Sequence, residues 1–106
     1  MALIDSRKSH WAPESQNIEL LNVTLGELLN DISRRYPHKE AIVYSVYPEL
    51  DLDIRWTYPE FNQKVNQVAK GLLAVGIRKG GKVGVWSSNV PEWILLMFAT
   101  ARIGAI

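Results

Sequence analysis

The sequence has no cysteine among its 106 residues. This absence excludes a disulfide framework, a zinc site built on thiolates and a cysteine nucleophile, and it agrees with a reducing compartment. The chain also lacks an excess of charge, because 12 basic and 11 acidic residues give a formal net charge of +1. This balance disfavours nucleic acid or an anionic membrane as the partner. Because the absence of cysteine agrees with a reducing compartment, we expect a cytoplasmic protein.

Long hydrophobic runs are also missing. The longest apolar run, W-I-L-L-M-F-A at 93–99, is much shorter than the roughly 20 residues that cross a bilayer, so it predicts a buried helix and no transmembrane segment. The first 16 residues mix polar and apolar types and do not resemble a signal peptide. A hydrophobic content of 47% in a chain of this length predicts one small domain with one core.

The periodic part of the sequence begins near residue 23, so we expect an extended arm at 1–22 and a domain at 23–106. Thr24 and Glu27 form a capping box that predicts the start of a helix, and Pro37 marks its end. The apolar face expected for this helix comprises Leu25, Leu28, Leu29, Ile32 and Tyr36.

Residues 40–46 and 53–57 have the composition of strands, and the polar stretch between them predicts an antiparallel hairpin. Thr57 and Glu60 repeat the capping box at the start of a longer helix, and Gly76 is placed to end that helix in a left-handed conformation. The apolar face of the second helix comprises Phe61, Val65, Val68, Ala69, Leu72 and Leu73.

A strand at 82–87 and a third helix at 90–103 follow, the helix opened by Asn89 as the N-cap with Pro91 just after it. Residues 104–106 resemble a helix cap leading into a further strand. The order of elements predicts an α/β fold: part of a three-layer domain in which an antiparallel hairpin precedes a βαβα unit, with the sheet incomplete at the C-terminus.

The stretch G-I-R-K-G-G-K-V at 76–83 satisfies part of the phosphate-loop pattern. A phosphate loop, however, connects a strand to a helix, whereas Gly76 ends a predicted helix and Lys82 begins a predicted strand. Position 83 is Val, where the pattern needs a hydroxyl. The sequence favours a helix cap followed by a tight turn.

Ser87, Ser88 and Asn89 are better placed for an anion or cofactor, because they follow a strand and precede a helix, where open α/β sheets bind ligands. The more ordinary role of Asn89 is to cap the helix. These three residues are the weak cofactor-binding candidates of the sequence.

Other polar groups favour structural roles. Glu49, Asp51 and Asp53 alternate on one predicted strand face in the manner of ligands for a divalent cation, but no glycine-containing calcium loop accompanies them, and a solvated hairpin edge is favoured. His10 and His38 lack any pattern for a base or a metal ligand. We assign no metal site.

A small basic cluster and several aromatic residues leave alternatives open. The basic cluster at 78–82 either meets an acidic partner or a nucleotide phosphate, or forms a solvated turn, which is favoured. An aromatic stacking platform for bases is a weak alternative to core and helix-start roles. The residues concerned are Arg78, Lys79, Lys82, Trp56, Phe61, Trp86 and Trp93.

Four blocks together resemble the start of the acyl-adenylate-forming enzymes, the AMP-dependent synthetase/ligase family, and within it the fatty acyl-CoA synthetases. The blocks are T-L-G-E-L-L at 24–29, R-W-T-Y-P-E-F at 55–61, V-A-K-G-L-L-A-V-G-I-R-K-G-G-K-V-G-V at 68–85 and N-V-P-E-W-I-L-L-M-F-A-T-A-R-I-G-A-I at 89–106. Their order and spacing carry the resemblance, whereas each block alone is weak.

The resemblance implies a two-step ligase that uses ATP, magnesium and coenzyme A to convert a fatty acid through an acyl-adenylate to a thioester. The family's phosphate loop, ribose-binding aspartate and C-terminal lysine are absent from these 106 residues, so no catalytic residue is assigned. We expect the chain to be the leading part of the family's large N-terminal domain, inactive by itself, with no tightly bound cofactor and with the remainder of the parent as its partner.

An alternative comes from a different class of protein. The chain is then a stand-alone α/β interaction module that self-associates through an exposed sheet edge and its third helix. An oligomer indifferent to ATP favours the module, and unstable material favours an incomplete fragment.

Overall fold

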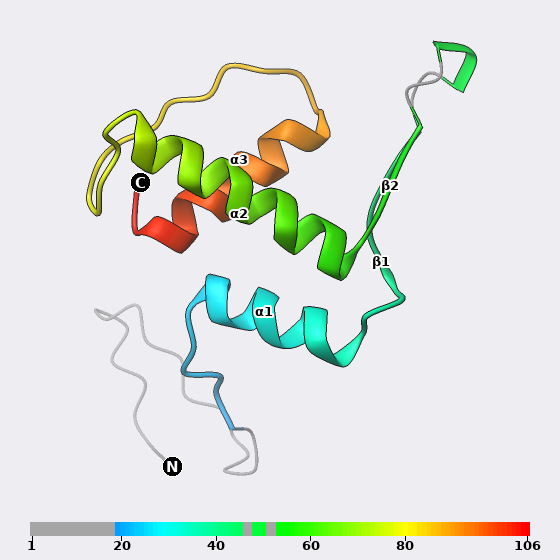
Figure 1. Ribbon diagram of the computed structural model, residues 1–106, viewed down its shortest axis with the longest axis horizontal. Helices are drawn as coiled ribbons and strands as arrows, with labels where there is room; N and C mark the ends of the chain where they lie inside the picture. The colour runs from blue at the N-terminus through cyan, green and yellow to red at the C-terminus, as the bar shows by residue number, and fades with distance from the viewer. Residues whose placement is uncertain (1–18, 46–47, 51–52) are drawn as a thin grey trace, which may run out of the picture.

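The computed structural model describes residues 19–45, 48–50 and 53–106. Its elements are α1 (Leu25–Arg35), β1 (Glu40–Tyr44), a short 3-10 helix η1 (Pro48–Leu50), β2 (Ile54–Thr57), α2 (Tyr58–Ala74) and α3 (Pro91–Ile103). In Figure 1, α2 lies between α1 and α3, and the β1–β2 hairpin projects away from the helices.

The first helix starts where its capping box predicts. The Thr24 hydroxyl accepts a hydrogen bond from the Glu27 N–H at 3.2 Å, and the Glu27 carboxylate accepts one from the Thr24 N–H at 2.8 Å. The bond from the Thr24 backbone is the main reason that the pKa of Glu27 is lowered from its ordinary value. Two N–H groups at the helix start are therefore satisfied by the sequence itself.

The predicted hairpin is confirmed as an antiparallel pair, with an irregularity in register between Glu40 and Ile42. The Arg55 guanidinium donates to both oxygens of Glu40, at 2.7 and 2.8 Å, and this bond raises the pKa of Arg55. Glu49 lies in η1, so the predicted alternation of Glu49 and Asp53 along one strand face is wrong. Asp51, the third acidic residue of that prediction, lies outside the described residues.

The second capping box is also confirmed. The Glu60 carboxylate accepts from the Thr57 N–H at 2.8 Å and the Thr57 hydroxyl accepts from the Glu60 N–H at 3.4 Å, so α2 begins directly after β2. The Thr57 backbone N–H is the main cause of the lowered pKa of Glu60. No loop separates strand from helix, and the hairpin is therefore held in a fixed direction relative to α2.

The core lies where the three helices meet. Phe61 and Phe98 pack edge to face, with ring centroids 5.4 Å apart and an interplanar angle of 79°, a geometry that aromatic pairs prefer. Leu25, predicted to lie on the buried face of α1, is wrongly assigned, since 53% of its surface is exposed. The buried core comprises Leu29, Phe61, Val65, Ala69, Leu95 and Ala99.

The third helix begins one residue later than predicted. Val90 is its N-cap and makes no side-chain capping bond, so the prediction that Asn89 caps the helix is wrong. Pro91 at the first helical position has no N–H to satisfy, and the Trp93 N–H donates to the Val90 carbonyl at 3.1 Å. These two features reduce the need for a polar cap.

The predicted strand at 82–87 is not formed as a strand in the described residues, although one end of it shows strand-like pairing. The Ile106 N–H donates to the Gly81 carbonyl at 2.7 Å, and the Val83 N–H donates to the Ile106 carbonyl at 2.8 Å. This is the pattern of a parallel pair with Lys82 opposite Ile106. A strand needs several paired neighbours, and here the pairing extends over one position.

The predicted fold class is confirmed as a partial α/β domain with an open two-stranded antiparallel sheet. Among the described residues, the parallel part of the predicted βαβα unit is present only as the pairing of Lys82 with Ile106. Among the described helices, none has the length and apolar character needed to cross a bilayer.

Candidate functional site

The loop at 76–83 begins as a helix cap. Gly76 has a φ of 97°, its N–H donates to the Leu73 carbonyl at 3.1 Å, and the Ile77 N–H donates to the Leu72 carbonyl at 3.0 Å. These bonds form a Schellman motif, as predicted for Gly76. The Arg78 guanidinium donates to the Leu73 carbonyl at 2.7 Å and further satisfies the helix end.

The rest of the loop at 76–83 bonds to the end of α3. The N–H groups of Gly80 and Val83 donate to the carbonyl oxygens of Gly104 and Ile106, each at 2.8 Å. A phosphate loop leaves such N–H groups free to converge on the anion. Because these N–H groups are already bonded to carbonyl oxygens, the loop is a structural connection and not a phosphate cradle.

Substitution of Gly76 tests this cap directly. Gly76→Ala is expected to reduce the free energy of unfolding by about 1–2 kcal/mol, because a side chain disfavours a positive φ. Gly71→Ala is the matched control: Gly71 is helical, no atom outside the nearby backbone of its own helix lies within 4 Å of an added Cβ, and we expect a gain of about 0.5–1 kcal/mol. Urea unfolding of both variants measures the difference, and equal effects would contradict the assignment of the cap.

A polar cluster centred on Arg102 joins all three helices. Its guanidinium donates to the side-chain oxygen of Asn66 on α2, to the Gly26 carbonyl on α1 at 3.2 Å and to the Asn30 side-chain oxygen at 3.1 Å. Burial lowers the pKa of Arg102 from its ordinary value. The Asn62 amide, also on α2, donates to the same Asn30 oxygen at 3.1 Å.

A hollow of about 260 Å³ lies beside the Arg102 cluster, and its lining includes Glu27 and Thr24. All the acceptors that Arg102 contacts are neutral oxygens, whereas the carboxylate in the hollow belongs to Glu27, which is held in the capping box of α1. Since Glu27 would repel an anion that approached Arg102, the cluster is suited to holding helices together and not to binding a phosphate.

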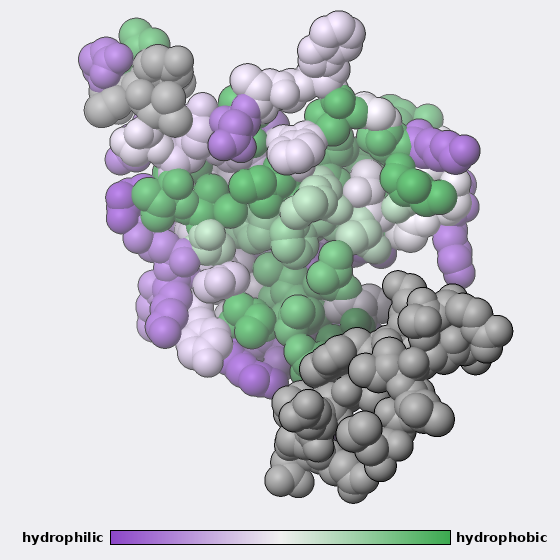
Figure 2. Space-filling view, turned by 180° about the vertical axis from the view of Figure 1, so that it is seen from behind, coloured by the Kyte–Doolittle hydropathy of each residue, from purple (hydrophilic) through white to green (hydrophobic). Residues whose placement is uncertain are grey.

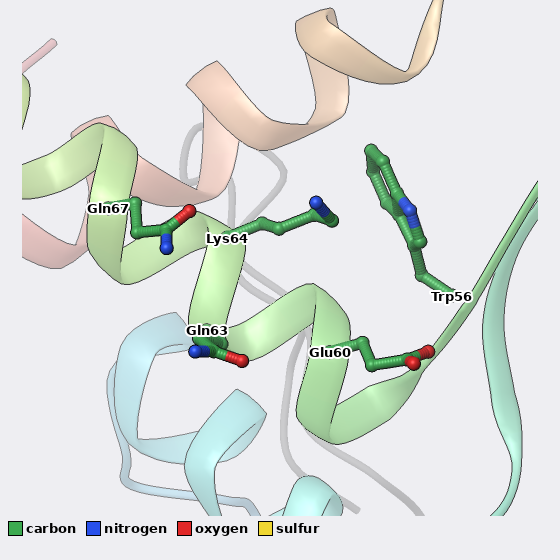
Figure 3. A pocket seen from close by; sticks show the side chains of 5 residues that line it. All are labelled: Trp56, Glu60, Gln63, Lys64 and Gln67. Atoms are coloured by element: carbon green, nitrogen blue, oxygen red, sulfur yellow. The ribbon is translucent and has the colours of Figure 1, made fainter.

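A second hollow, of about 350 Å³, lies between the hairpin and the first turns of α2 (Figure 3). The Lys64 ammonium points toward the Trp56 ring and lies 4.9 Å from its centroid, a cation–π contact. The Gln63 and Gln67 amides and the Glu60 carboxylate complete the lining. Glu60 is engaged at the start of α2, so the hollow offers polar contacts without a nucleophile and base held together.

The cofactor-binding candidates Ser87, Ser88 and Asn89 are all exposed and lie in the irregular segment before α3. They remain a prediction, since no bond in the described residues gives them a ligand-directed geometry. His38 is exposed in the turn after α1, and His10 lies outside the described residues. Neither the hollow beside the Arg102 cluster nor the hollow beside Trp56 is lined by Ser87, Ser88, Asn89 or His38.

Within residues 19–45, 48–50 and 53–106, no group of three or more His, Cys, Asp or Glu side chains is placed to hold a metal ion. The Arg102 cluster was missed by sequence reasoning, because its residues come from three separate helices without a shared motif: Gly26 and Asn30 from α1, Asn66 from α2 and Arg102 from α3. Arginine at the end of an apolar helix and asparagine on two others were the available signals, and neither identifies a partner.

Comparison with known proteins places this arrangement in a family. The model of the AMP-binding enzyme family matches residues 29–106, which is more than half of the chain. YngI of Bacillus subtilis (strain 168), whose name describes an acyl-CoA synthetase, is 44% identical over 88 residues, covering 83% of this chain and 15% of that protein. The mouse medium-chain acyl-CoA ligase ACSF2, mitochondrial, is 38% identical over 87 residues, covering 82% of this chain and 13% of the ligase.

A solved structure shows the same similarity in three dimensions. The Mycobacterium tuberculosis fatty acyl CoA synthetase superposes with a TM-score of 0.69 at 31% identity, over 78% of this chain and 16% of that one. The chain is much shorter than its relatives: it spans 15%, or about a seventh, of the length of YngI. The residues that match the family model, 29–106, contain the hairpin, α2 and α3 completely and most of α1.

Proposed function

Because the chain belongs to the AMP-binding enzyme family, we propose that it is the N-terminal portion of an ATP-dependent fatty acyl-CoA ligase. In the parent, a carboxylate and ATP give an acyl-adenylate and pyrophosphate, and coenzyme A then displaces AMP to give the thioester. The match of the family model to residues 29–106 is the observation that carries this proposal. The names of the relatives support the acyl-CoA part of it.

We further propose that residues 23–106 form the leading part of the large N-terminal domain of the parent, preceded by an arm at 1–22. The packing of α2 on α3 and the bonds from Gly80 and Val83 to the end of α3 support a scaffold role. The chain's own contribution is then to hold a hairpin and two helices in fixed positions for residues supplied by the rest of the parent.

The cofactors of the proposed reaction are ATP, magnesium and coenzyme A, all bound by the parent. We propose that the 106-residue chain binds none of them tightly. The N–H groups of the loop at 76–83 that bond to α2 and α3 support this, because a nucleotide phosphate would have to displace those internal bonds. Ser87, Ser88 and Asn89 are the residues proposed to approach the nucleotide or substrate in the parent.

The decisive experiment is pyrophosphate release. The purified 106-residue chain, with ATP, magnesium, coenzyme A and fatty acids of several chain lengths, is expected to release pyrophosphate at the rate of a no-enzyme blank. The longer parent enzyme, assayed side by side, is expected to release it only when a fatty acid is present. Fatty-acid-dependent release by the short chain would refute its inactivity, and a parent inert toward fatty acids would refute the substrate.

We propose a cytoplasmic location for the parent. The support is indirect, since the absence of cysteine agrees with a reducing compartment. The ACSF2 relatives, the mouse protein among them, are named as mitochondrial, and that description applies to those proteins. Fractionation of cells that express the tagged parent separates the two locations.

A further inference from the structure

The hairpin meets α2 without a connecting loop, since β2 ends at Thr57 and α2 begins at Tyr58. Figure 1 shows the hairpin projecting from this junction, and Figure 2, seen from behind, shows apolar side chains gathered across the middle of the molecule, away from the far end of the hairpin. On the β1 side of the junction, the Tyr58 N–H donates to the Lys39 carbonyl at 2.9 Å. The contacts at the base of the hairpin therefore decide its direction.

Two consecutive residues of β2 are each held by a side chain of α2. The Glu60 carboxylate accepts from the Thr57 N–H at 2.8 Å and from the Thr57 hydroxyl at 3.1 Å. The Lys64 ammonium lies 4.9 Å from the centroid of the Trp56 ring. Successive side chains of a strand point to opposite faces, so contacts to both residues oppose rotation of the strand as well as bending.

The two side chains of α2 also support each other. Glu60 lies four residues before Lys64, which is the favourable order for such a pair on a helix. The pKa of Glu60 is lowered chiefly by its bonds to Thr57 and further by the charge of Lys64. Lys64 is half-buried, whereas lysine side chains are mostly exposed. Its ammonium is therefore held in place between the carboxylate of Glu60 and the ring of Trp56.

The other capping box of the chain lacks this second contact. At the start of α1, Thr24 and Glu27 form the same reciprocal bonds. The residue before Thr24 is Val23, which is 50% exposed, and the residue four positions after Glu27 is Asp31, which pairs with Arg35 at 2.6 Å. Among the described residues no strand leads into α1. Capping alone does not need an aromatic ring and a lysine, and the pair occurs at the box where a strand has to be oriented.

We propose that Trp56 and Lys64 form a latch that, together with the capping box of α2, fixes the direction of the hairpin relative to α2. Without the charge of Lys64 the strand keeps one attachment, at Glu60, and the hairpin can rotate about it. Both residues of the latch are positioning residues. The inference rests on contacts within the described residues and does not depend on the ligase activity of the parent.

Hydrogen exchange at the Tyr58 amide tests the latch, because this N–H is bonded to Lys39 and is released when the hairpin moves away from α2. Lys64→Gln removes the charge with little change in helix propensity, and we expect about 2–5 times faster exchange, the factor that corresponds to a cation–π contact of roughly 0.5–1 kcal/mol. Core amides of α2 and α3 are expected to keep their rates. Lys64→Arg is expected to keep the original Tyr58 rate, because a guanidinium also stacks on an aromatic ring.

A double-mutant cycle with Trp56→Leu separates the latch from the other contacts of Lys64. The acceleration of Tyr58 exchange in the double variant is expected to be about 2–5 times smaller than the product of the two single effects, since the contact is lost only once. Lys70→Gln is the matched control, because Lys70 is an exposed lysine of the same helix. An unchanged Tyr58 rate in Lys64→Gln, equal acceleration of the core amides, or single effects that simply multiply would each overturn the proposal.

Residual dipolar couplings of the strand amides measure the direction itself. In the original chain and in Lys64→Arg, the couplings of β1 and β2 are expected to fit the same alignment as those of α2. In Lys64→Gln the couplings of the strands are expected to shrink relative to those of α2, because the hairpin then averages over several directions. A hairpin that shares the alignment of α2 equally well in Lys64→Gln would contradict the latch.

Discussion

Replacement of Phe61 by alanine is expected to remove about 3–5 kcal/mol from the free energy of unfolding. Phe61 is buried in the centre of the core, where its ring packs edge to face on Phe98. The loss combines the transfer of a large apolar group, the cavity left behind and an aromatic contact worth roughly 0.5–1.5 kcal/mol. Because small domains have only about 5–15 kcal/mol in total, most of the variant is expected to be unfolded at moderate temperature.

Thermal unfolding followed by circular dichroism measures this effect. The melting temperature of Phe61→Ala is expected to fall by at least about 12 °C, since each 1 kcal/mol corresponds to roughly 4–8 °C in a domain of this size. Leu21→Ala is the control, because Leu21 is an exposed aliphatic residue outside the core. A Phe61→Ala variant as stable as Leu21→Ala would contradict the position of the core.

Replacement of Arg102 by alanine is expected to cost about 2 kcal/mol and to loosen α1 in particular. Its guanidinium is the shared donor to the Gly26 carbonyl, the Asn30 side chain and the Asn66 side chain, so one substitution leaves oxygens on two helices without this partner. The Cα of Arg102 also lies 3.7 Å from the position of a Cβ on Gly26, which shows how closely α3 approaches α1.

Limited proteolysis distinguishes a loose α1 from general unfolding. In Arg102→Ala we expect cleavage within α1 to become faster than cleavage within α2. Arg102→Lys is expected to be intermediate, because lysine keeps the charge but lacks the planar fork. Arg34→Ala serves as the surface control, since its side chain is 77% exposed and changes of this kind stay within about 0.5 kcal/mol. Equal cleavage of α1 in Arg102→Ala and Arg34→Ala would refute the clamp.

Local signals in the sequence predicted most of the fold. Both capping boxes, at Thr24 and at Thr57, work through residues three positions apart, so their bonds form wherever the helix forms. The left-handed Gly76 follows from the same locality, because its partners lie in the preceding turn. The hairpin was predictable because two stretches with the composition of strands flank a polar stretch.

Long-range contacts were not predictable in this way. Ser33 is buried because its hydroxyl bonds to the Leu29 carbonyl at 2.7 Å and to the Tyr58 carbonyl at 3.2 Å, and the second contact is 25 residues away. Periodicity placed Leu25 on the buried face of α1, but the packing of α2 and α3 decides which part of that face is covered, and Leu25 lies outside it. The helical period predicts an apolar stripe along a helix, but the neighbouring helices decide which residues of that stripe are buried.

The same contrast between local signals and long-range contacts holds for the candidate site. Sequence order alone excluded a phosphate loop at 76–83, because helix-then-strand reverses the required arrangement, and the observed bonds agree. The strand at 82–87 and the N-cap at Asn89 were not found, since a strand depends on a neighbour and the position of a cap depends on where Pro91 sets the first turn. The neighbour of a strand is not written in the local residues, whereas the position of the cap follows from Pro91, which favours the first helical position more strongly than Asn89 favours the N-cap.

The joined ends of α2 and α3 have a consequence for hydrogen exchange. The Gly80 N–H is protected by a carbonyl of the α3 cap, and the Ile106 N–H is protected by the Gly81 carbonyl of the loop after α2. Neither amide can exchange with solvent unless the two helix ends separate. Amides that open together share one opening free energy and define a cooperative unit. The last residue of the chain and the loop 25 positions before it should therefore exchange as a pair, while the neighbouring amides at 84–88 exchange freely.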